Sequence, residues 1–353
     1  MLVPVLWFVL GLILLIKGGD WFVDGAAGIA KKFHIPDLLI GATVVSIGTT
    51  LPEVMVSASS AAIGHGQMAY GNAIGSIICN TSLVAAITIA IKPAKVDKKS
   101  MIVPVIFYFI SAAFYAGTAY VTGTFSRPVG FILLAIFLIY MVINVKSAMK
   151  SKNAEPVVEK SVESTVAEAS DVPSDESKAG KSKAEKPEKE KPIWLLLILL
   201  VVGAALIAWG ANLLVDNGII IAEAFGVPET VIALTFVALG TSLPELVTAV
   251  TSLIKGHGAL SVGNICGANL FNLVLVSGLS VAIGPFSLAD AGFAKTTIAG
   301  IETYKALLVD TPLIFVVMGI MTIPVLVKGK LSRWQGVLLL CIYAAFCAYQ
   351  FIG

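Results

Sequence analysis

The sequence Gly48-Thr-Thr-Leu-Pro-Glu53 recurs 192 residues later as Gly240-Thr-Ser-Leu-Pro-Glu245. The same offset aligns the neighbouring residues without a gap, and 13 of the 33 positions from 48 to 80 are identical to their partners in the second half. Farther upstream, the identical pairs are Gly18 with Gly210, Asp24 with Asp216, and Pro36 with Pro228. This self-similarity indicates an internal duplication in which each copy contributes one equivalent segment.

Both copies lie in a chain that is too apolar for an ordinary soluble domain. Of its 353 residues, 57% are hydrophobic and 13% are charged, and the mean hydropathy is +0.93. Spanning about 30 Å of hydrocarbon takes roughly 20 apolar residues. Ten stretches meet this requirement, at approximately residues 2–29, 35–63, 68–91, 102–122, 129–146, 193–222, 230–254, 259–284, 311–327 and 334–352. The sequence therefore predicts an all-α integral membrane protein with ten transmembrane helices.

The net charge and the cysteines argue against other classes of protein. A net charge of +2 without a basic stripe offers nucleic acid no surface to bind. The four cysteines lie in apolar stretches without CxxC spacing, so they indicate neither a disulfide framework nor a zinc site. They are Cys79, Cys266, Cys341 and Cys347. We expect no cofactor.

Residues 150–192 form a charged segment between the two halves. They include 9 lysines, 10 acidic residues, seven serines and four prolines, but no Leu, Ile, Met or aromatic residue. Such a composition cannot bury enough apolar surface to fold alone, which predicts a disordered linker between repeats at 1–149 and 193–353. A plain solvated tether and a docking or regulatory segment both remain open.

The distribution of basic residues predicts how the repeats are oriented. Lysine and arginine gather in alternate connections, near residues 31–32, 92–99, 150–191, 255 and 328–333. These connections should be cytoplasmic. The helices would then span a cell membrane, with both termini outside the cell and the linker in the cytoplasm. Because each repeat has five helices, an odd number, the second enters the membrane in the opposite orientation. Inverted-topology repeats are typical of secondary transporters, whose ion sites lie near the midplane.

Glu53 and Glu245 are the main candidates for such a site. Each lies near the middle of an apolar helix, where an unpaired charge is costly and therefore indicates function. A buried glutamate that merely bonds to a neighbouring helix explains one occurrence, but it explains poorly why both copies carry the residue.

The residues around each glutamate supply further oxygen atoms. Pro52 and Pro244 lack an N–H, so the carbonyls four residues earlier, at Gly48 and Gly240, lose their helical donor. We expect unwound backbone beside four hydroxyls, those of Thr49, Thr50, Thr241 and Ser242. An all-oxygen set suits hard cations such as Ca²⁺, whereas zinc or copper prefers His or Cys.

The helix after each sextet adds polar groups. Ser76 and Asn80 share one face, and the second copy has Ala268 and Asn272 there, with Asn269 nearby. Four glycines form small-xxx-small faces, which let helices approach closely; they are Gly71, Gly75, Gly263 and Gly267. Asn72 and Asn264 fit a role in joining helices and a role as ligands equally well.

Two further pairs fit simpler roles. His65 and His257 lie in Gly-His-Gly turns, where a turn or interface role is favoured over metal binding. Asp24 and Asp216 lie towards the ends of long helices, where we expect capping or surface positions.

The paired sextets, each followed by Gly-Asn-x-x-Gly, resemble those of the cation/calcium antiporter superfamily, and most closely its prokaryotic sodium/calcium exchangers. The resemblance covers both repeats and implies a central site shared by calcium and sodium. It implies ligands from the side chains of Glu53, Glu245, Thr49, Thr50, Ser76, Asn80, Thr241, Ser242 and Asn272, and from the carbonyls of Ser46 and Ala238.

Two positions depart from the pattern of the family. Ala268 stands where prokaryotic relatives often have Ser, and Asn272 stands where potassium-dependent members carry Asp. The second departure predicts independence from potassium.

These observations predict an antiporter that exchanges sodium for calcium by alternating access, and not an enzyme. A calcium/proton antiporter that protonates the same two glutamates is the alternative, although protons need no hydroxyl ligands. An intramembrane enzyme would need no inverted duplication, and a scaffold leaves both buried charges unexplained. Partners should be the two ions and the lipid bilayer.

Overall fold

The computed structural model describes residues 2–152, 191–225, 238–291, 293, 295–298 and 301–352, which are mostly helical. Most of the predicted linker, residues 153–190, lies outside the described residues. The first half contains α1 (Leu2–Phe33), α2 (Asp37–Ile40), the π-helical turn η1 (Gly41–Val45), α3 (Ser46–Ala62), α4 (Gly66–Cys79), the π-helical turn η2 (Asn80–Ala85), α5 (Ala86–Ile91), α6 (Lys98–Thr122) and α7 (Arg127–Lys152).

The second half repeats this order. It contains α8 (Ile193–Ala224), α10 (Ala238–Thr241), α11 (Leu243–Ile254), α12 (Gly258–Phe271), the π-helical turn η4 (Asn272–Val276), α13 (Ser277–Ile283), the π-helical turn η5 (Ala306–Asp310), α14 (Thr311–Lys328) and α15 (Arg333–Ile352). The antiparallel strand pairs are β1 (Thr124–Phe125) with β2 (Phe286–Ser287) and β3 (Lys295–Ile298) with β4 (Ile301–Tyr304).

The spans follow the hydropathy prediction. Among the described residues, eight helical segments are long and apolar enough to cross a membrane. The seventh and tenth predicted spans correspond to shorter apolar helices, Leu243–Ile254 and Arg333–Tyr349. The predicted all-α membrane architecture is therefore confirmed. The short strands lie in connections, where hydropathy gives no signal.

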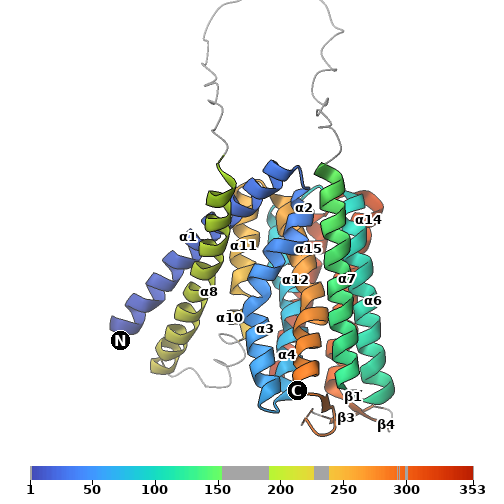
Figure 1. Cartoon of the computed structure of the whole chain (residues 1–353). Helices are drawn as coiled ribbons and strands as arrows, with labels where there is room; N and C mark the ends of the chain where they lie inside the picture. The colour runs from blue at the N-terminus through green and yellow to red at the C-terminus, as the bar shows by residue number, and fades with distance from the viewer. Residues whose placement is uncertain are drawn as a thin grey trace, which may run out of the picture.

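The two repeats run in opposite directions through the helix bundle. In Figure 1, α1 runs towards the end of the bundle at which α7 ends, and α8 starts at that end and runs back. We call this the linker end. Both chain termini lie towards the opposite end in Figure 1, in agreement with an odd number of spans in each repeat.

The helices α1 and α8 pack together and supply most of a second hydrophobic cluster, which also takes in Ile40, Val45 and Leu260. This cluster includes Phe22 and Ile29 of α1 and Leu196 and Ile207 of α8, whereas the larger core joins α4–α7 to α12–α15. Glycines let the two backbones approach, because a Cβ added at Gly18 would lie 2.9 Å from the carbonyl oxygen of Gly203. In Figure 1 this pair leans away from the other helices.

Close packing at the central helices differs between the repeats. A Cβ at Gly263 of α12 would collide with the backbone of Leu38, and one at Gly267 would collide with Ser46. The equivalent Gly71 and Gly75 of α4 have no other atoms within 4 Å of such a Cβ. Among the described residues, which omit 226–237, the small-residue faces predicted in both copies therefore bring backbones into contact only in the second copy.

This difference predicts unequal effects of alanine at equivalent positions. Gly263→Ala should lower the free energy of unfolding by about 1–3 kcal/mol, because the added methyl overpacks the contact with α2. Gly71→Ala should leave the free energy of unfolding unchanged, because no other described atom lies within 4 Å of a Cβ at that position. Thermal unfolding of the purified protein in detergent measures both. Equal destabilisation by the two variants would contradict this account of the packing.

Candidate cation-binding site

The two sextets lie at different kinds of helix interruption. In the first copy, α3 stays helical through Pro52, so the unwinding predicted there is wrong. A membrane helix can absorb one missing N–H, and the irregular backbone of this copy is η1, which ends directly before Ser46. In the second copy the prediction holds, because the helix breaks at Ser242, between α10 and α11.

Glu53 and Glu245 are both completely buried, each with 0% of its surface exposed. None of their four carboxylate oxygens has a hydrogen-bond partner among the described residues, and neither residue forms an ion pair there. The two groups are near enough for their charges to interact. Two adjacent carboxylates in a low-dielectric interior are unfavourable unless cations or protons neutralise them.

Other polar side chains predicted for the site are buried as well. The hydroxyls of Thr50 and Ser242 and the side-chain amides of Asn80 and Asn272 are buried without a hydrogen-bond partner in the described structure. Such unpaired groups are rare in native interiors, because each costs free energy. Carboxylate, hydroxyl and amide oxygens are the kind of ligand that hard cations such as Ca²⁺ prefer.

The remaining predicted ligands differ from these in their hydrogen bonds, burial and position. The Thr49 hydroxyl lies beside Glu245 and donates to the Asn264 side-chain oxygen at 3.2 Å. The Ser46 hydroxyl donates to the carbonyls of Gly41 and Asn264, at 2.7 and 2.9 Å. Ser76 is buried, Thr241 is half-buried, and Ala238 begins α10.

Asn80 and Asn272 each begin a π-helical turn, η2 and η4 respectively. Single π-helical turns inside α-helices occur often at functional sites, because the extra residue frees backbone groups and re-aims side chains. The two turns are related by the repeat offset. Sequence periodicity did not show them, since a one-residue insertion leaves the apolar pattern of a buried helix unchanged.

The structure separates the two asparagines whose roles were open. The Asn72 side-chain amide donates to the Glu53 carbonyl at 3.2 Å and to the Ser57 hydroxyl at 2.8 Å, so it joins α4 to α3. Asn264 accepts from Thr49, while its amide nitrogen is buried without a partner. Asn72 therefore fits the joining role and Asn264 lies in the polar centre.

A line of buried hydroxyls on α11 was missed by the sequence reading. Thr248 lies three residues after Glu245, and Ser252 lies four residues after Thr248, which places all three on one helix face. Both hydroxyls are fully buried and unpaired within the described residues. The line leads from Glu245 towards the linker end. The signal for it is a polar stripe of helical period in an apolar helix.

A cavity of about 780 Å³ reaches the sextets from the side of α8. It lies between α1 and α8 on one side and α3, α10 and α11 on the other. Gly48, Pro52, Thr241 and Pro244 line its inner part, and Met55 and Asp216 lie farther out. The cavity therefore reaches residues of both sextets next to Glu53 and Glu245, although neither glutamate lines it.

The weaker candidates lie away from this centre. His65 is exposed, and the His257 imidazole nitrogen Nδ1 lies 2.8 Å from Asp37 Oδ2, which raises the pKa of His257. Asp24 forms ion pairs with Lys191 and Lys255 and its side chain is 40% exposed, so of the two roles expected for it, capping or a surface position, it has the surface position. All four cysteines are free thiols.

Comparisons with known proteins bear on this arrangement. The model of the family described as sodium/calcium exchanger protein matches residues 3–146 and 195–352. The chain is 32% identical to the putative antiporter CaxA of Alkalimonas amylolytica, over 100% of this chain and 99% of that protein. It is 29% identical to the sodium/calcium exchanger MaX1 of Methanosarcina acetivorans, over 97% of each.

Solved structures resemble the whole chain. A structure of the sodium-calcium exchanger NCX_Mj, soaked with zero Na⁺ and Ca²⁺, superposes with a TM-score of 0.73 at 28% identity and covers 99% of both chains. A structure of the same protein soaked with 10 mM Na⁺ and 10 mM Sr²⁺ gives a TM-score of 0.72.

The geometry predicts how calcium changes stability. At a calcium concentration 100 times the Kd, a single site should raise the free energy of unfolding by about 2.7 kcal/mol. Glu53→Gln and Glu245→Gln should each abolish this increase while leaving the protein folded, because each removes a ligand charge and keeps the volume. Thermal unfolding with and without calcium measures the effect.

Asn72→Ala serves as the matched control. It removes the bond to the Glu53 carbonyl, so the baseline melting temperature should fall while the calcium-dependent increase is kept. An undiminished calcium response in Glu245→Gln, or its loss in Asn72→Ala alone, would contradict the assignment.

Proposed function

Because this chain belongs to the sodium/calcium exchanger family and is therefore a cation/calcium antiporter, we propose that it exchanges sodium for calcium across the membrane by alternating access. The observation that carries the proposal is the pair of fully buried, unpartnered carboxylates at Glu53 and Glu245. Sodium and calcium compete for this pair, so the protein exposes it to one side of the membrane at a time.

The neutral ligands favour sodium over protons as the coupling ion. A proton would satisfy a carboxylate alone, whereas Na⁺ needs several oxygens around it. The unpaired hydroxyls of Thr50 and Ser242 and the amides of Asn80 and Asn272 provide these oxygens. A calcium/proton antiporter would leave these buried groups without a purpose, at a cost in stability.

Charge balance suggests the stoichiometry. With Glu53 and Glu245 ionised and asparagine at both positions 80 and 272, the site has a formal charge of −2. One Ca²⁺ or two Na⁺ neutralise it, and a third Na⁺ held by neutral oxygens makes the loaded protein positive. Exchange of three Na⁺ for one Ca²⁺ therefore moves net charge and responds to voltage. No further carboxylate lies in the sextets for potassium, so transport is independent of potassium.

The arrangement in the membrane follows from the lysines and the duplication. Residues 1–149 and 193–353 act as two inverted repeats that each contribute one glutamate. The linker end faces the cytoplasm and both termini face outwards, because the basic connections lie at the linker end. The 150–192 segment is a cytoplasmic tether.

Flux into proteoliposomes tests the coupling ion. Radioactive calcium uptake should follow an imposed outward sodium gradient, because both ions compete for Glu53 and Glu245, and an equivalent proton gradient should not drive it. Glu245→Gln should reduce sodium-driven uptake at least about 100-fold, which corresponds to roughly 2.7 kcal/mol of lost binding or transition-state free energy. Uptake driven by protons and indifferent to sodium would establish the calcium/proton alternative.

Voltage tests the stoichiometry separately. With the membrane potential clamped by a second ion, an inside-negative potential should slow calcium uptake in exchange for internal sodium and speed the reverse reaction, because each cycle moves one positive charge with the sodium. Asn272→Asp changes the formal site charge from −2 to −3 and should alter both the ion preference and the voltage response. A flux that ignores voltage would refute three sodium ions per cycle, and a strict potassium requirement would refute the interpretation of Asn272.

A further inference from the structure

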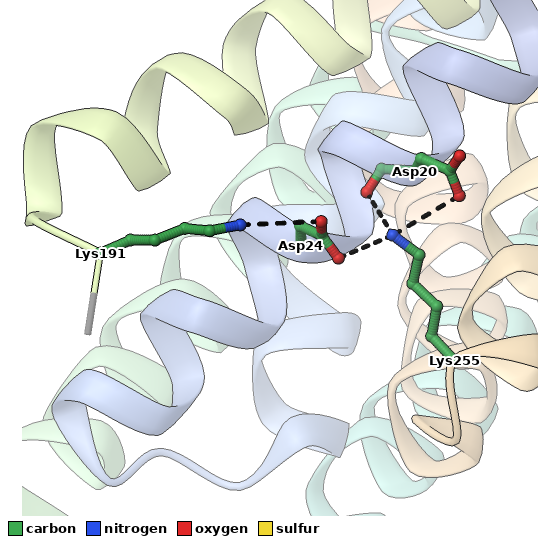
Figure 2. Close-up of polar contacts among 4 residues, drawn as sticks. All are labelled: Asp20, Asp24, Lys191 and Lys255. Carbon is green, nitrogen blue, oxygen red and sulfur yellow. Dashed lines mark hydrogen bonds and ion pairs between the residues drawn. The ribbon is translucent and has the colours of Figure 1, made fainter. Parts of the chain in front are cut away.

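The side chain of Lys255, at the linker end of α11, binds to α1 through three oxygens. Figure 2 shows Nζ at the centre of this contact. It lies 2.7 Å from Asp24 Oδ1, 2.8 Å from the Asp20 carbonyl oxygen and 3.5 Å from Asp20 Oδ1. The Lys255 side chain is only 25% exposed, so water screens this contact less than it screens an ordinary surface pair.

Lys191 adds a weaker contact from the segment before α8. Its Nζ lies 3.8 Å from Asp24 Oδ2, and its side chain is more exposed than that of Lys255 (Figure 2). Asp20, Asp24, Lys191 and Lys255 together form what we call the linker-end cluster. It fastens α1 to the turn between α11 and α12, and His257 in that turn pairs with Asp37 of α2.

The other repeat lacks this contact. At the offset of 192, Asp20 and Asp24 correspond to Asn212 and Asp216, and Lys255 corresponds to Ile63. Asn212 and Asp216 line the open cavity, and the Ile63 side chain is 72% exposed. One end of the molecule thus has a lysine between the long helix and the neighbouring turn, and the opposite end has an apolar residue at the equivalent position.

Helix packing shows the same asymmetry. At the linker end, a Cβ added at Gly19 of α1 would lie 2.6 Å from Val247 and 3.0 Å from Thr251, so α1 touches α11. The counterparts of Gly19 and Val247 are Ala211 and Met55, and both line the cavity between α8 and α3. In the part of the chain that the structure describes, α1 is therefore packed against α11 at the linker end, whereas a cavity separates α8 from α3.

Lys255 also lies at the end of the buried hydroxyl line. Glu245, Thr248, Ser252 and Lys255 follow one another at spacings of three, four and three, which places them along one face of α11 and its C-cap. A polar stripe from the carboxylate to the linker end is what an ion needs to leave in that direction. In this conformation Lys255 and α1 cover its outer end.

We propose that Lys255 is a positioning residue for exchange: its bonds to Asp20 and Asp24 hold α1, and α8 with it, against α11, and their release opens the hydroxyl line at the linker end. The proposal rests on the exchange by alternating access inferred above. The hydrophobic cluster that joins α1 to α8 is distinct from the larger core and takes in only Ile40, Val45 and Leu260 from other segments among its buried residues, so this pair can shift while the larger core stays packed. Because Ile63 replaces the lysine in the other repeat, the two ends close with unequal strength.

Cysteine accessibility tests this without any ion gradient. In full-length protein in which Cys79, Cys266, Cys341 and Cys347 are alanine, Val247→Cys reports on the closed end and Met55→Cys on the cavity. A water-soluble maleimide is added to the purified protein in detergent. Lys255→Ile, which introduces the residue of the other repeat, should raise the labelling rate at position 247 roughly fivefold, as expected for the loss of one partly exposed ion pair. The rate at position 55 should not rise.

Three further variants decide between positioning and a general loss of structure. Lys255→Arg should restore a slow rate at position 247, because arginine can reach the same oxygens. Lys191→Gln should leave both rates near those of the parent protein, because Lys191 makes only the 3.8 Å contact. Asp24→Asn should act like Lys255→Ile, and it keeps the proposal testable if that variant fails to fold.

An unchanged rate at position 247 in both Lys255→Ile and Asp24→Asn would overturn the proposal. A parallel rise at positions 55 and 247 would also overturn it, because that pattern means general loosening. These labelling rates do not depend on the coupling ion. If sodium-driven flux fails but labelling changes as expected, the proposed function is rejected and the role of Lys255 stands. If sodium-driven flux is observed but labelling at position 247 does not change, the role of Lys255 is rejected and the proposed function stands.

Discussion

Two buried carboxylates that have no hydrogen-bond partner among the described residues are the constraint on which the rest of the structure depends. Glu53 and Glu245 are fully enclosed, and the hydroxyls and amides around them are unpaired as well. A structural core would satisfy these groups internally, because each unpaired buried group costs free energy. Here the charge has to be balanced by cations or protons, and in the proposed function sodium and calcium do so, which turns the unfavourable electrostatics of the two carboxylates into affinity for these ions.

The inverted duplication explains how a chain can hold such a site in the middle of a membrane. Each repeat contributes one sextet and one asparagine at the start of a π-helical turn, so the four elements converge from opposite directions. Irregular backbone at this depth is tolerated where protein surrounds it or where it lines a cavity. The large core of α4–α7 with α12–α15 supplies that surrounding, and α1 and α8 cover the remaining side.

The asymmetry between the repeats gives the fold a direction. Equivalent helices pack differently: α12 touches the backbone of Leu38 where α4 leaves open space, and α1 touches α11 where α8 is separated from α3 by a cavity. A symmetric molecule would have both ends alike and could not favour one side. The linker-end cluster adds an electrostatic bond at the closed end, and the opposite end carries Ile63 in place of the lysine.

By itself, the sequence determined the membrane class, the ten spans, the inverted duplication, the exchanger resemblance and the two glutamates as candidate ligands. These follow from apolar length, helix parity and the cost of a charge in hydrocarbon, which are local or periodic properties. The tertiary structure alone decided that α3 continues through Pro52, that Asn72 joins helices and that Asp24 binds Lys255. Each of these depends on contacts between segments far apart in the chain, for which one-dimensional spacing carries no information.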